Sequence, residues 1–389
     1  MVKIQFLLFI FLILIVGCGD KMALPPVKHS PTSFGANDTS YIHLQPDWSA
    51  ASIGYSPAHP MKPVDITIGD DSYIFIADQD NDKIIVVTES GALATTNNMN
   101  KISPVVNPVS IDIDAKLNLL IVNGTNTVYV WNQFLNVTGI KRAAFDTTES
   151  GELNFTSDQA VLDSILGVHP FYVDANENAS FRGVAFGPAE DNSVFITDQA
   201  ENRILKLRIL VGAAVELADR GYLFPVFQGF YEKDIASYGT GAGTVDTPEQ
   251  ITCDDDGNVY FTQLGGNFLV QKLRYNGSTY SAAYTLYEDP IMDLNRFMGP
   301  HDIALGLNDA IFILDTADSG RVSKFYNRGS FAGKPANLGK KGLVDARFNH
   351  PLGIAISSTE VVYIANTDDH LIERYQFSVS EDDLPQEPQ

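Results

Sequence analysis

Eight polar residues lie at the entrances of similar apolar segments and could act together as a binding site. They are Asp65, Ser110, Arg182, Glu249, Gln250, His301, Asp302 and His350. Carboxylates and imidazoles that converge in a concave mouth can hold a divalent cation, such as Ca²⁺ or Zn²⁺, or a polar ligand. Such convergence requires the apolar segments to surround one axis. We therefore predict a polar channel mouth, with His301 and Asp302 as the candidate metal ligands.

A second set of polar residues ends six apolar segments at regular positions. The set comprises Asp78, Asn123, Asp198, Gln263, Asp315 and Asn366. Because each member belongs to a different copy of the pattern, we expect these residues to be spread around the molecule. Side chains of this kind at strand ends accept hydrogen bonds from turn N–H groups. We assign them this structural role, with Lys83, Arg203 and Arg321 as further donors.

Both sets are positioned by one pattern that occurs six times. An apolar strand, a polar turn and a second apolar strand follow one another in each copy. Twelve residues separate the first Ile from the terminal polar residue in five copies, as from Ile66 to Asp78, and the copy from Val184 to Asp198 is two residues longer. Such regular spacing indicates one structural unit repeated around a ring or along a stack.

The repeated segments have the composition of β-strands that are covered on both faces. Residues 74–77 and 362–365, for example, are β-branched, aromatic or small, without a helical stripe. Sheets stacked face to face around an axis bury both faces of their middle strands. We therefore predict an all-β, six-bladed β-propeller. The last copy has room for only three strands, so Tyr41–Leu44 is expected to supply its outer strand and close the ring.

Two longer insertions interrupt the regular spacing. They cover residues 137–179 and 210–235. Because loops on a rigid scaffold often carry specificity, we expect these insertions to decorate one rim of the propeller, where a partner would bind.

The repeats resemble those of the NHL family of β-propellers. The resemblance covers residues 60–378 and rests on the Pro-x-x-Ile entrance of the first strand, the Asp that ends the second, and the Asn-Arg-Ile that follows, best seen from Asp198 to Ile204. Copy two departs from the pattern with Asn123, and copy four departs with Gln263. The resemblance implies a six-bladed NHL/TolB-like propeller.

The stretch 299–303 carries a more specific resemblance. Its Gly-Pro-His-Asp-Ile sequence is similar to the Pro-His-Asp-Ile stretch of the peptidyl-hydroxyglycine amidating lyases, NHL propellers that hold zinc with histidines from several blades. This implies a metal-dependent lyase or hydrolase with its site in the central channel. Only His301 matches that context, because His350 precedes its proline. The sequence leaves open whether the protein is an enzyme, and no cofactor is assigned.

The N-terminal residues 1–17 have the features of an export signal. Lys3 precedes an unbroken apolar run over residues 6–16. This run is too short for a lasting transmembrane helix, which takes about 20 residues. The sequence Ile-Val-Gly-Cys that ends at Cys18 resembles the lipobox of bacterial lipoproteins. The resemblance implies cleavage before Cys18 and lipidation of its thiol.

The rest of the chain divides into three parts. Residues 18–39 are largely polar with several prolines and are predicted to form a flexible tether. Residues 40–378 are predicted to form one propeller domain. Residues 379–389 are acidic and are predicted to form a disordered tail.

Charge and the predicted anchor restrict the partners and the location. The formal net charge of −22 disfavours binding to nucleic acid, since a polyanion repels phosphate backbones. We predict an extracytoplasmic protein that is held on a bacterial membrane by lipid, with the outer membrane or cell surface preferred.

The preferred function is a binding or scaffold module that presents its rim to a protein, peptide or glycan. The alternative is the metal-dependent lyase or hydrolase described above.

Overall fold

A computed structural model describes residues 40–94, 102–132, 145–147, 153–155, 167–217, 222–284, 290–294, 296–307, 310–317, 320–325, 336–339 and 348–378. These belong to one compact unit, Ser40–Ser378. The predicted export signal, the tether with Cys18 and the acidic tail lie outside the described residues. No helix within the described ranges is long and apolar enough to cross a membrane.

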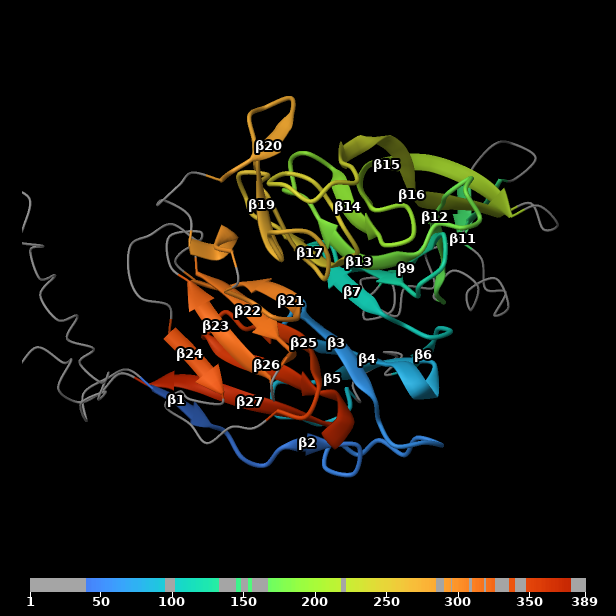
Figure 1. Cartoon of the computed structure of the whole chain (residues 1–389). Helices are drawn as coiled ribbons and strands as arrows, with labels where there is room; N and C mark the ends of the chain where they lie inside the picture. The colour runs from blue at the N-terminus through green and yellow to red at the C-terminus, as the bar shows by residue number, and fades with distance from the viewer. Residues whose placement is uncertain are drawn as a thin grey trace, which may run out of the picture. The chain divides into compact units, whose positions relative to one another are not determined.

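The described strands form six antiparallel sheets, here called blades one to six, arranged around one axis (Figure 1). The first strands are β3 (Pro63–Ile68), β7 (Ser110–Ile113), β13 (Phe181–Phe186), β17 (Pro248–Cys253), β21 (Pro300–Leu305) and β25 (Pro351–Ile356). The second strands are β4 (Ile74–Asp78), β8 (Asn118–Val122), β14 (Ser193–Asp198), β18 (Val259–Gln263), β22 (Ile311–Asp315) and β26 (Val361–Asn366).

The third and outer strands complete each blade. The third strands are β5 (Lys83–Val87), β9 (Thr127–Asn132), β15 (Arg203–Leu217), β19 (Val270–Tyr275), β23 (Arg321–Phe325) and β27 (Leu371–Ser378). The outer strands are β6 (Ile102–Pro104), β12 (His169–Val173), β16 (Tyr222–Ala236), β20 (Tyr280–Ala282), β24 (Ala336–Gly339) and β1 (Ser40–His43).

The ring closes at blade six as the sequence predicted. Each first strand contacts the first strands of both neighbouring blades, and β25 contacts β3 across the closure. Strand β1 pairs antiparallel with β27, with Tyr41 opposite Phe377 and His43 opposite Tyr375. The short strand β2 (Trp48–Ser49) pairs with the other end of β27. The prediction of an all-β, six-bladed propeller closed by an N-terminal strand is confirmed.

The core lies between the blades because the second strands are apolar on both faces. All residues of β4, β8 and β22 are buried. Phe75 of blade one, for example, belongs to the same apolar cluster as Leu119 and Trp131 of blade two. Full burial of one such side chain stabilises the fold by roughly 1.5–3 kcal/mol.

The two insertions contribute strands instead of free rim loops. The insertion over residues 210–235 lies within β15 and β16, which form a long hairpin in blade three. The insertion over residues 137–179 contains β10 (Phe145–Thr147) and β11 (Leu153–Phe155), which extend that same blade, and β12, which completes blade two. Blade three thus contains six described strands (Figure 1).

Candidate functional site at the propeller axis

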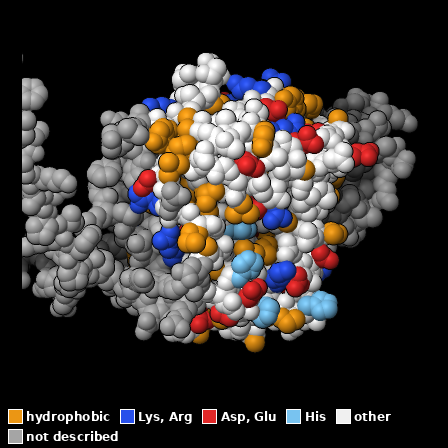
Figure 2. Space-filling view, in the orientation of Figure 1, with side chains coloured by type: hydrophobic (Ala, Val, Ile, Leu, Met, Phe, Trp, Pro, Cys, Tyr) orange, Lys and Arg blue, Asp and Glu red, His pale blue; other side chains and the backbone are white. Residues whose placement is uncertain are grey.

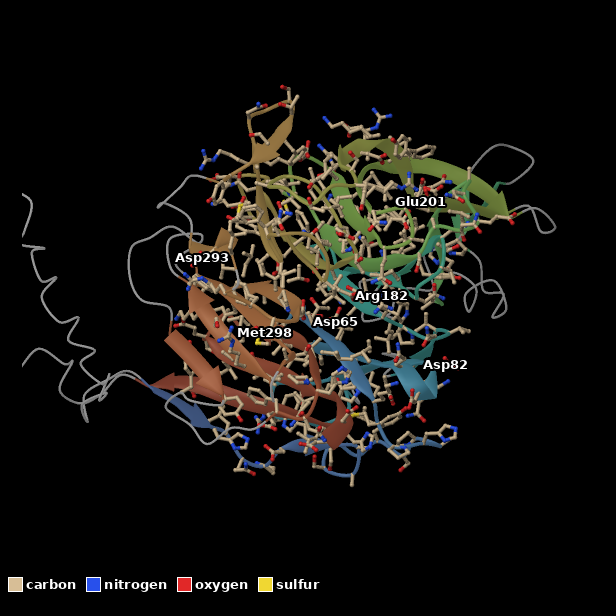
Figure 3. The ribbon with its side chains drawn as sticks, in the orientation of Figure 1. Asp65, Asp82, Arg182, Glu201, Asp293 and Met298 are labelled. Atoms are coloured by element: carbon tan, nitrogen blue, oxygen red, sulfur yellow. The ribbon has the colours of Figure 1, made fainter. Side chains whose placement is uncertain are left out.

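The first strands bring equivalent residues of successive blades to the axis in layers. The first layer contains Val64, Val109, Arg182, Glu249, His301 and Leu352, which precede the common Ile or Val by two positions. The second layer, one residue further, contains Asp65, Ser110, Gly183, Gln250, Asp302 and Gly353. The first layer lies at the face of the propeller where the first strands begin, which we call the entry face. Figure 3 shows Asp65 and Arg182 near the centre of the ring.

Three first-layer residues from blades three, four and five form a connected row, which we call the polar row. Arg182 Nη2 donates to Glu249 Oε2 at 3.2 Å. His301 Nε2 lies 3.7 Å from the same oxygen. Gln199, at the end of β14, donates to Glu249 Oε1 at 2.6 Å. Arg182, Glu249 and His301 thus lie together, and Gln199, which was not among the candidate residues, joins them.

The hydrogen bonds of His301 define its tautomer. Its Nδ1 lies 2.8 Å from the carbonyl oxygen of Leu352, which can only accept, so Nδ1 carries the proton. Burial lowers the pKa of His301 to about 4, so the imidazole is neutral at neutral pH. Its unprotonated Nε2 therefore faces Glu249, whose pKa is raised by burial despite the neighbouring Arg182. This pair can accept a proton or a hydrogen bond from a ligand.

Below the polar row lies an axial cavity of about 190 Å³. Its polar lining residues come from blades one, two, four and five, and they are Asp65, Thr67, Ser110, Asp112, Gln250, Thr252 and Asp302. Its apolar wall includes Ile66, Ile111, Val184, Ile251, Ile303 and Ile354. Arg182, Glu249 and His301 are not part of this lining. The predicted channel-mouth set is thus divided between the polar row and the cavity.

Three buried aspartates bridge neighbouring blades through both carboxylate oxygens. Asp65 accepts the N–H of Ile66 and that of Ile111 in blade two, both at 2.7 Å. Asp302 accepts the N–H of Ile303 and that of Ile354 in blade six, again at 2.7 Å.

Asp112 makes the same bridge from blade two to blade three. It accepts the N–H groups of Ile113 at 2.9 Å and Phe186 at 2.7 Å. Asp112 was missed because it follows the strand's Ile instead of preceding it. The alternation Ile-Asp-Ile at 111–113 was the available signal, since it turns Asp112 to the same side of the strand as Ser110.

Threonine hydroxyls bridge three other blade junctions. Thr197 donates to Glu249 O at 2.5 Å, and Thr262 donates to His301 O at 2.7 Å. Thr367 donates to Pro63 O at 2.7 Å across the closure of the ring. In the described part of the chain, each junction between neighbouring blades is therefore bridged at the axis by one aspartate or one threonine.

Buried carboxylates dominate the electrostatics of the cavity. Burial raises the pKa of Asp112 and of Asp302 to about 7. Burial and the proximity of Asp302 raise the pKa of Asp65 well above its ordinary value. No Lys or Arg belongs to the described lining of the cavity. Two hydroxyls moderate the effect, since Ser110 and Thr67 bond to Asp65 and Asp112 respectively.

The described residues do not supply a complete zinc site. Within these ranges, no three His, Cys, Asp or Glu side chains are grouped so that they could hold a metal ion. His350 lies on the loop before β25, half exposed, with Nδ1 3.6 Å from Asp368 Oδ2. A metal at His301 and Glu249 would thus need ligands from elsewhere.

The residues that end the second strands hold the chain segment entering each blade. Five of them accept a backbone N–H group of that segment. Asp78 accepts from Lys62 at 2.8 Å, and Asp198 accepts from Ser180 at 2.9 Å. Gln263 accepts from Asp246 at 3.0 Å, Asp315 accepts from Gly299 at 3.0 Å, and Asn366 accepts from Asn349 at 2.7 Å. Asn123 instead donates to Val106 O at 3.1 Å. These residues are spread around the entry face and do not meet at one site.

Two of the three expected basic partners bond to these residues. Arg203 Nε donates to Asp198 at 3.0 Å, and Arg321 Nη2 donates to Asp315 at 3.1 Å. Lys83 makes no such bond to Asp78 in the described residues, and that expectation is wrong. The physical reason is that Tyr55 and Asn81 already donate to Asp78 Oδ2, at 3.0 and 2.9 Å.

Exposed apolar side chains lie on three adjoining loops of the entry face, which we call the apolar patch. The patch consists of Tyr238, Leu264, Leu294 and Met298, which are 67%, 50%, 49% and 75% exposed. Backbone bonds from Leu264 to Thr247 and from Asn267 to Thr240 join the first two loops. Phe268 and Phe297 pack in one cluster and join the third. Figure 2 shows hydrophobic side chains gathered to the left of the centre of the ring, on the side where Figure 3 labels Met298.

The sequence did not predict this patch. Its members follow no repeat, because each belongs to an irregular connection whose exposure depends on how neighbouring loops pack.

Comparisons with known proteins find only weak similarity to solved structures. No family model matches the chain. A streptogramin B lyase structure is 14% identical, with a TM-score of 0.47, over 88% of this chain and 98% of that one. Virginiamycin B lyase from Staphylococcus aureus is 12% identical, with a TM-score of 0.47, over 87% of this chain and 99% of that one. A protein of unknown function from Bacteroides thetaiotaomicron is 14% identical, with a TM-score of 0.49, over 88% of this chain and 77% of that one.

Similarity at this level carries no information about activity or ligands. The class of the protein therefore follows from its own strands: it is a six-bladed β-propeller with a polar row and an acidic cavity at its axis. Membership of the NHL family stays a prediction.

Proposed function

We propose that the protein is an extracytoplasmic binding module, tethered to a bacterial membrane by lipid on Cys18, that holds a protein or peptide partner on its entry face. In this proposal the six repeats are NHL repeats, and the export signal and lipobox deliver the propeller to the outer membrane or cell surface.

The observation that carries the proposal is the apolar patch beside the polar row. Contiguous exposed apolar side chains rimmed by polar residues mark interaction sites on soluble domains. Met298 and Leu264 offer aliphatic surface, which an apolar side chain of a partner would cover. Such surface favours a protein or peptide over a glycan, because a glycan presents mainly hydroxyl groups.

The polar row supplies directional contacts next to this surface. The Arg182 guanidinium is partly exposed and uses one of its donors, Nη2, on Glu249. A backbone carbonyl or a carboxylate of the partner could accept from Arg182. The neutral His301 beside it could accept an N–H group.

Recovery of partners from native membranes tests the proposal. Wild-type protein and the Met298→Asp variant would be purified from gently solubilised membranes, and co-purifying proteins would be measured. We expect the charge at position 298 to reduce recovery of the partner by about tenfold or more, since it would be desolvated in the interface.

Leu307→Asp is the matched control, because Leu307 is 42% exposed but lies between β21 and β22 on the opposite face. Equal losses for both variants, or no loss for Met298→Asp, would contradict the proposed face.

A metal-dependent lyase or hydrolase is the second candidate. The observation in its favour is the neutral His301 with Nε2 directed toward Glu249, a pair that could bind a metal or transfer a proton. Metal analysis of the purified protein, followed by His301→Ala and Asp302→Ala, tests it. A stoichiometric metal that these substitutions remove would favour the enzyme, and a metal-free folded protein would favour the binding module.

A further inference from the structure

We propose that the axial cavity binds a small organic ammonium ion, whose charged group is held by Asp302, Asp112 and Gln250 and whose hydrocarbon part packs on the isoleucine wall. This site is separate from the entry face, because Arg182, Glu249 and His301 do not line the cavity.

The size of the cavity favours a ligand larger than a single ion. Its volume of about 190 Å³ corresponds to roughly six water molecules at about 30 Å³ each. A bare cation would leave most of this space filled by water against an apolar wall. An alkylammonium ion of a few carbons would fill it and would place its hydrocarbon chain on the isoleucines at the same time.

The charge of the cavity favours a cation. The three carboxylates use their oxygens to accept backbone N–H groups, but each oxygen has two lone pairs, so acceptor capacity remains. Asp302 retains the most unused acceptor capacity, because no hydroxyl group of the described residues bonds to it, whereas Ser110 bonds to Asp65 and Thr67 bonds to Asp112. A buried carboxylate is costly unless it is protonated or paired, and an ammonium group would pair it.

Gln250 gives independent evidence for a polar guest. It is 3% exposed and lines the cavity, yet its side-chain amide has no hydrogen-bond partner in the described residues. Its backbone N–H, by contrast, donates to Thr262 Oγ1 at 3.0 Å. Its amide atoms are not among the fully buried polar atoms that lack a partner, so they remain accessible at the cavity, where a guest could accept or donate a hydrogen bond.

Gly183 leaves room for this amide. A Cβ at position 183 would lie 3.0 Å from Gln250 Oε1 and 2.6 Å from the carbonyl oxygen of Glu249. The absence of a side chain in blade three therefore leaves the space that the Gln250 side chain occupies beside the cavity.

Calorimetric titration of the purified full chain with n-butylammonium chloride tests the proposal. The titration would be made at about pH 8.5, where carboxyls with ordinary or moderately raised pKa values are ionised and the amine is still protonated. We expect saturable binding of butylammonium with one site per chain and no binding of n-butanol. Calcium chloride, titrated alone, distinguishes a metal site from an ammonium site.

Two variants connect the binding to the cavity. Asp302→Asn should weaken butylammonium binding by about tenfold or more, because it removes a charge-assisted hydrogen bond. Gln250→Leu should weaken binding severalfold while leaving the melting temperature of the free protein nearly unchanged, since the side-chain amide makes no hydrogen bond within the described residues. This second variant keeps the test decisive if Asp302→Asn does not fold.

Three results would overturn the proposal. These are the absence of saturable butylammonium binding, equal binding by wild type and Gln250→Leu, and stoichiometric calcium binding that butylammonium does not displace.

Discussion

At the scale of residues, aspartates and threonines at the axis both bridge neighbouring blades by hydrogen bonds to the backbone. Asp65, Asp112 and Asp302 accept backbone N–H groups of the next blade, whereas Thr197 and Thr262 donate to backbone carbonyls of the next blade. Both kinds satisfy buried backbone groups that would otherwise lack partners where first strands of different blades meet. The carboxylates do so at an electrostatic cost, and the threonines do not.

Thr197→Val tests the threonine bridge. The hydroxyl of Thr197 accepts the N–H of Gly183 at 2.7 Å and donates to Glu249 O. Its loss leaves two buried groups unsatisfied, so we expect the free energy of unfolding to fall by about 1–3 kcal/mol. Chemical denaturation measures this, and Thr197→Ser, which keeps the hydroxyl, should lose much less. A valine variant as stable as the wild type would exclude a bridging role.

The carboxylate bridge predicts a pH dependence. In the folded state the pKa of Asp302 is raised to about 7 from an ordinary 3.8, so the folded protein holds a proton that the unfolded chain has lost between these values. Stability from this group is therefore complete below about pH 4 and is lost as the pH rises to about 7.

Comparison with Asp302→Asn reports this effect together with the change at Asp65, whose pKa the nearby Asp302 raises in the same direction. Burial of His301 gives the opposite slope, because its pKa is lowered to about 4, but that contribution is present in both proteins and cancels. The wild type should thus lose stability relative to Asp302→Asn as the pH rises from about 4 to about 7, measured by denaturation at each pH. A constant difference across this range would contradict the raised pKa.

Sequence reasoning located residues at the axis better than it described their contacts. The position before the common Ile identified Asp65, Gln250 and Asp302 as neighbours in space, because a repeat places equivalent residues in equivalent sites. It could not show that Arg182 and Glu249 pair, since the pairing depends on which blades are adjacent and on the direction of each side chain.

At the scale of elements, the short strand β1 closes the ring of blades. It supplies the outer strand of blade six, so N-terminal and C-terminal parts of the domain pair in one sheet. Leu44 N also donates to Arg374 O at 2.8 Å just beyond the strand. The closure removes a free edge from β27.

Two truncations test the role of β1. A chain that begins at Ser40 lacks the tether but keeps β1, and it should melt as the full chain does. A chain that begins at Gln45 lacks β1 and should melt several degrees lower, because β27 loses its partner for residues 375–378. Differential scanning calorimetry measures both. Equal melting temperatures would show that the pairing of β1 with β27 does not stabilise the propeller.

The second strands were the most predictable elements, and the outer strands were the least. Residues such as Phe75 and Ile76 are buried on both faces, and this double burial produces the continuous apolar run that the sequence displays. Strand β10 pairs with β16, far along the chain, and β11 joins the blade only through β10, and pairing at such separation leaves no local pattern to read.

At the scale of the whole molecule, the proposed lipid anchor on Cys18 would hold the protein at a membrane. Two or more acyl chains hold a protein on a bilayer, whereas one holds it only marginally. We expect Cys18→Ser to shift the protein from the membrane fraction to the soluble fraction. Fractionation checks this, and mass spectrometry of the mature N-terminus should show acyl chains on Cys18. An unmodified thiol with residues 1–17 retained would exclude the anchor.

The proposal as a whole depends on which face of the propeller meets a partner. A photo-crosslinking amino acid placed at position 298 in living cells tests this most directly, with position 307 on the opposite face as the reference. We predict one dominant crosslinked protein or peptide from position 298, reduced by substitution of Leu264 with Asp, and little from position 307. Crosslinks of equal strength from both positions, or none from position 298, would contradict a binding site on the entry face.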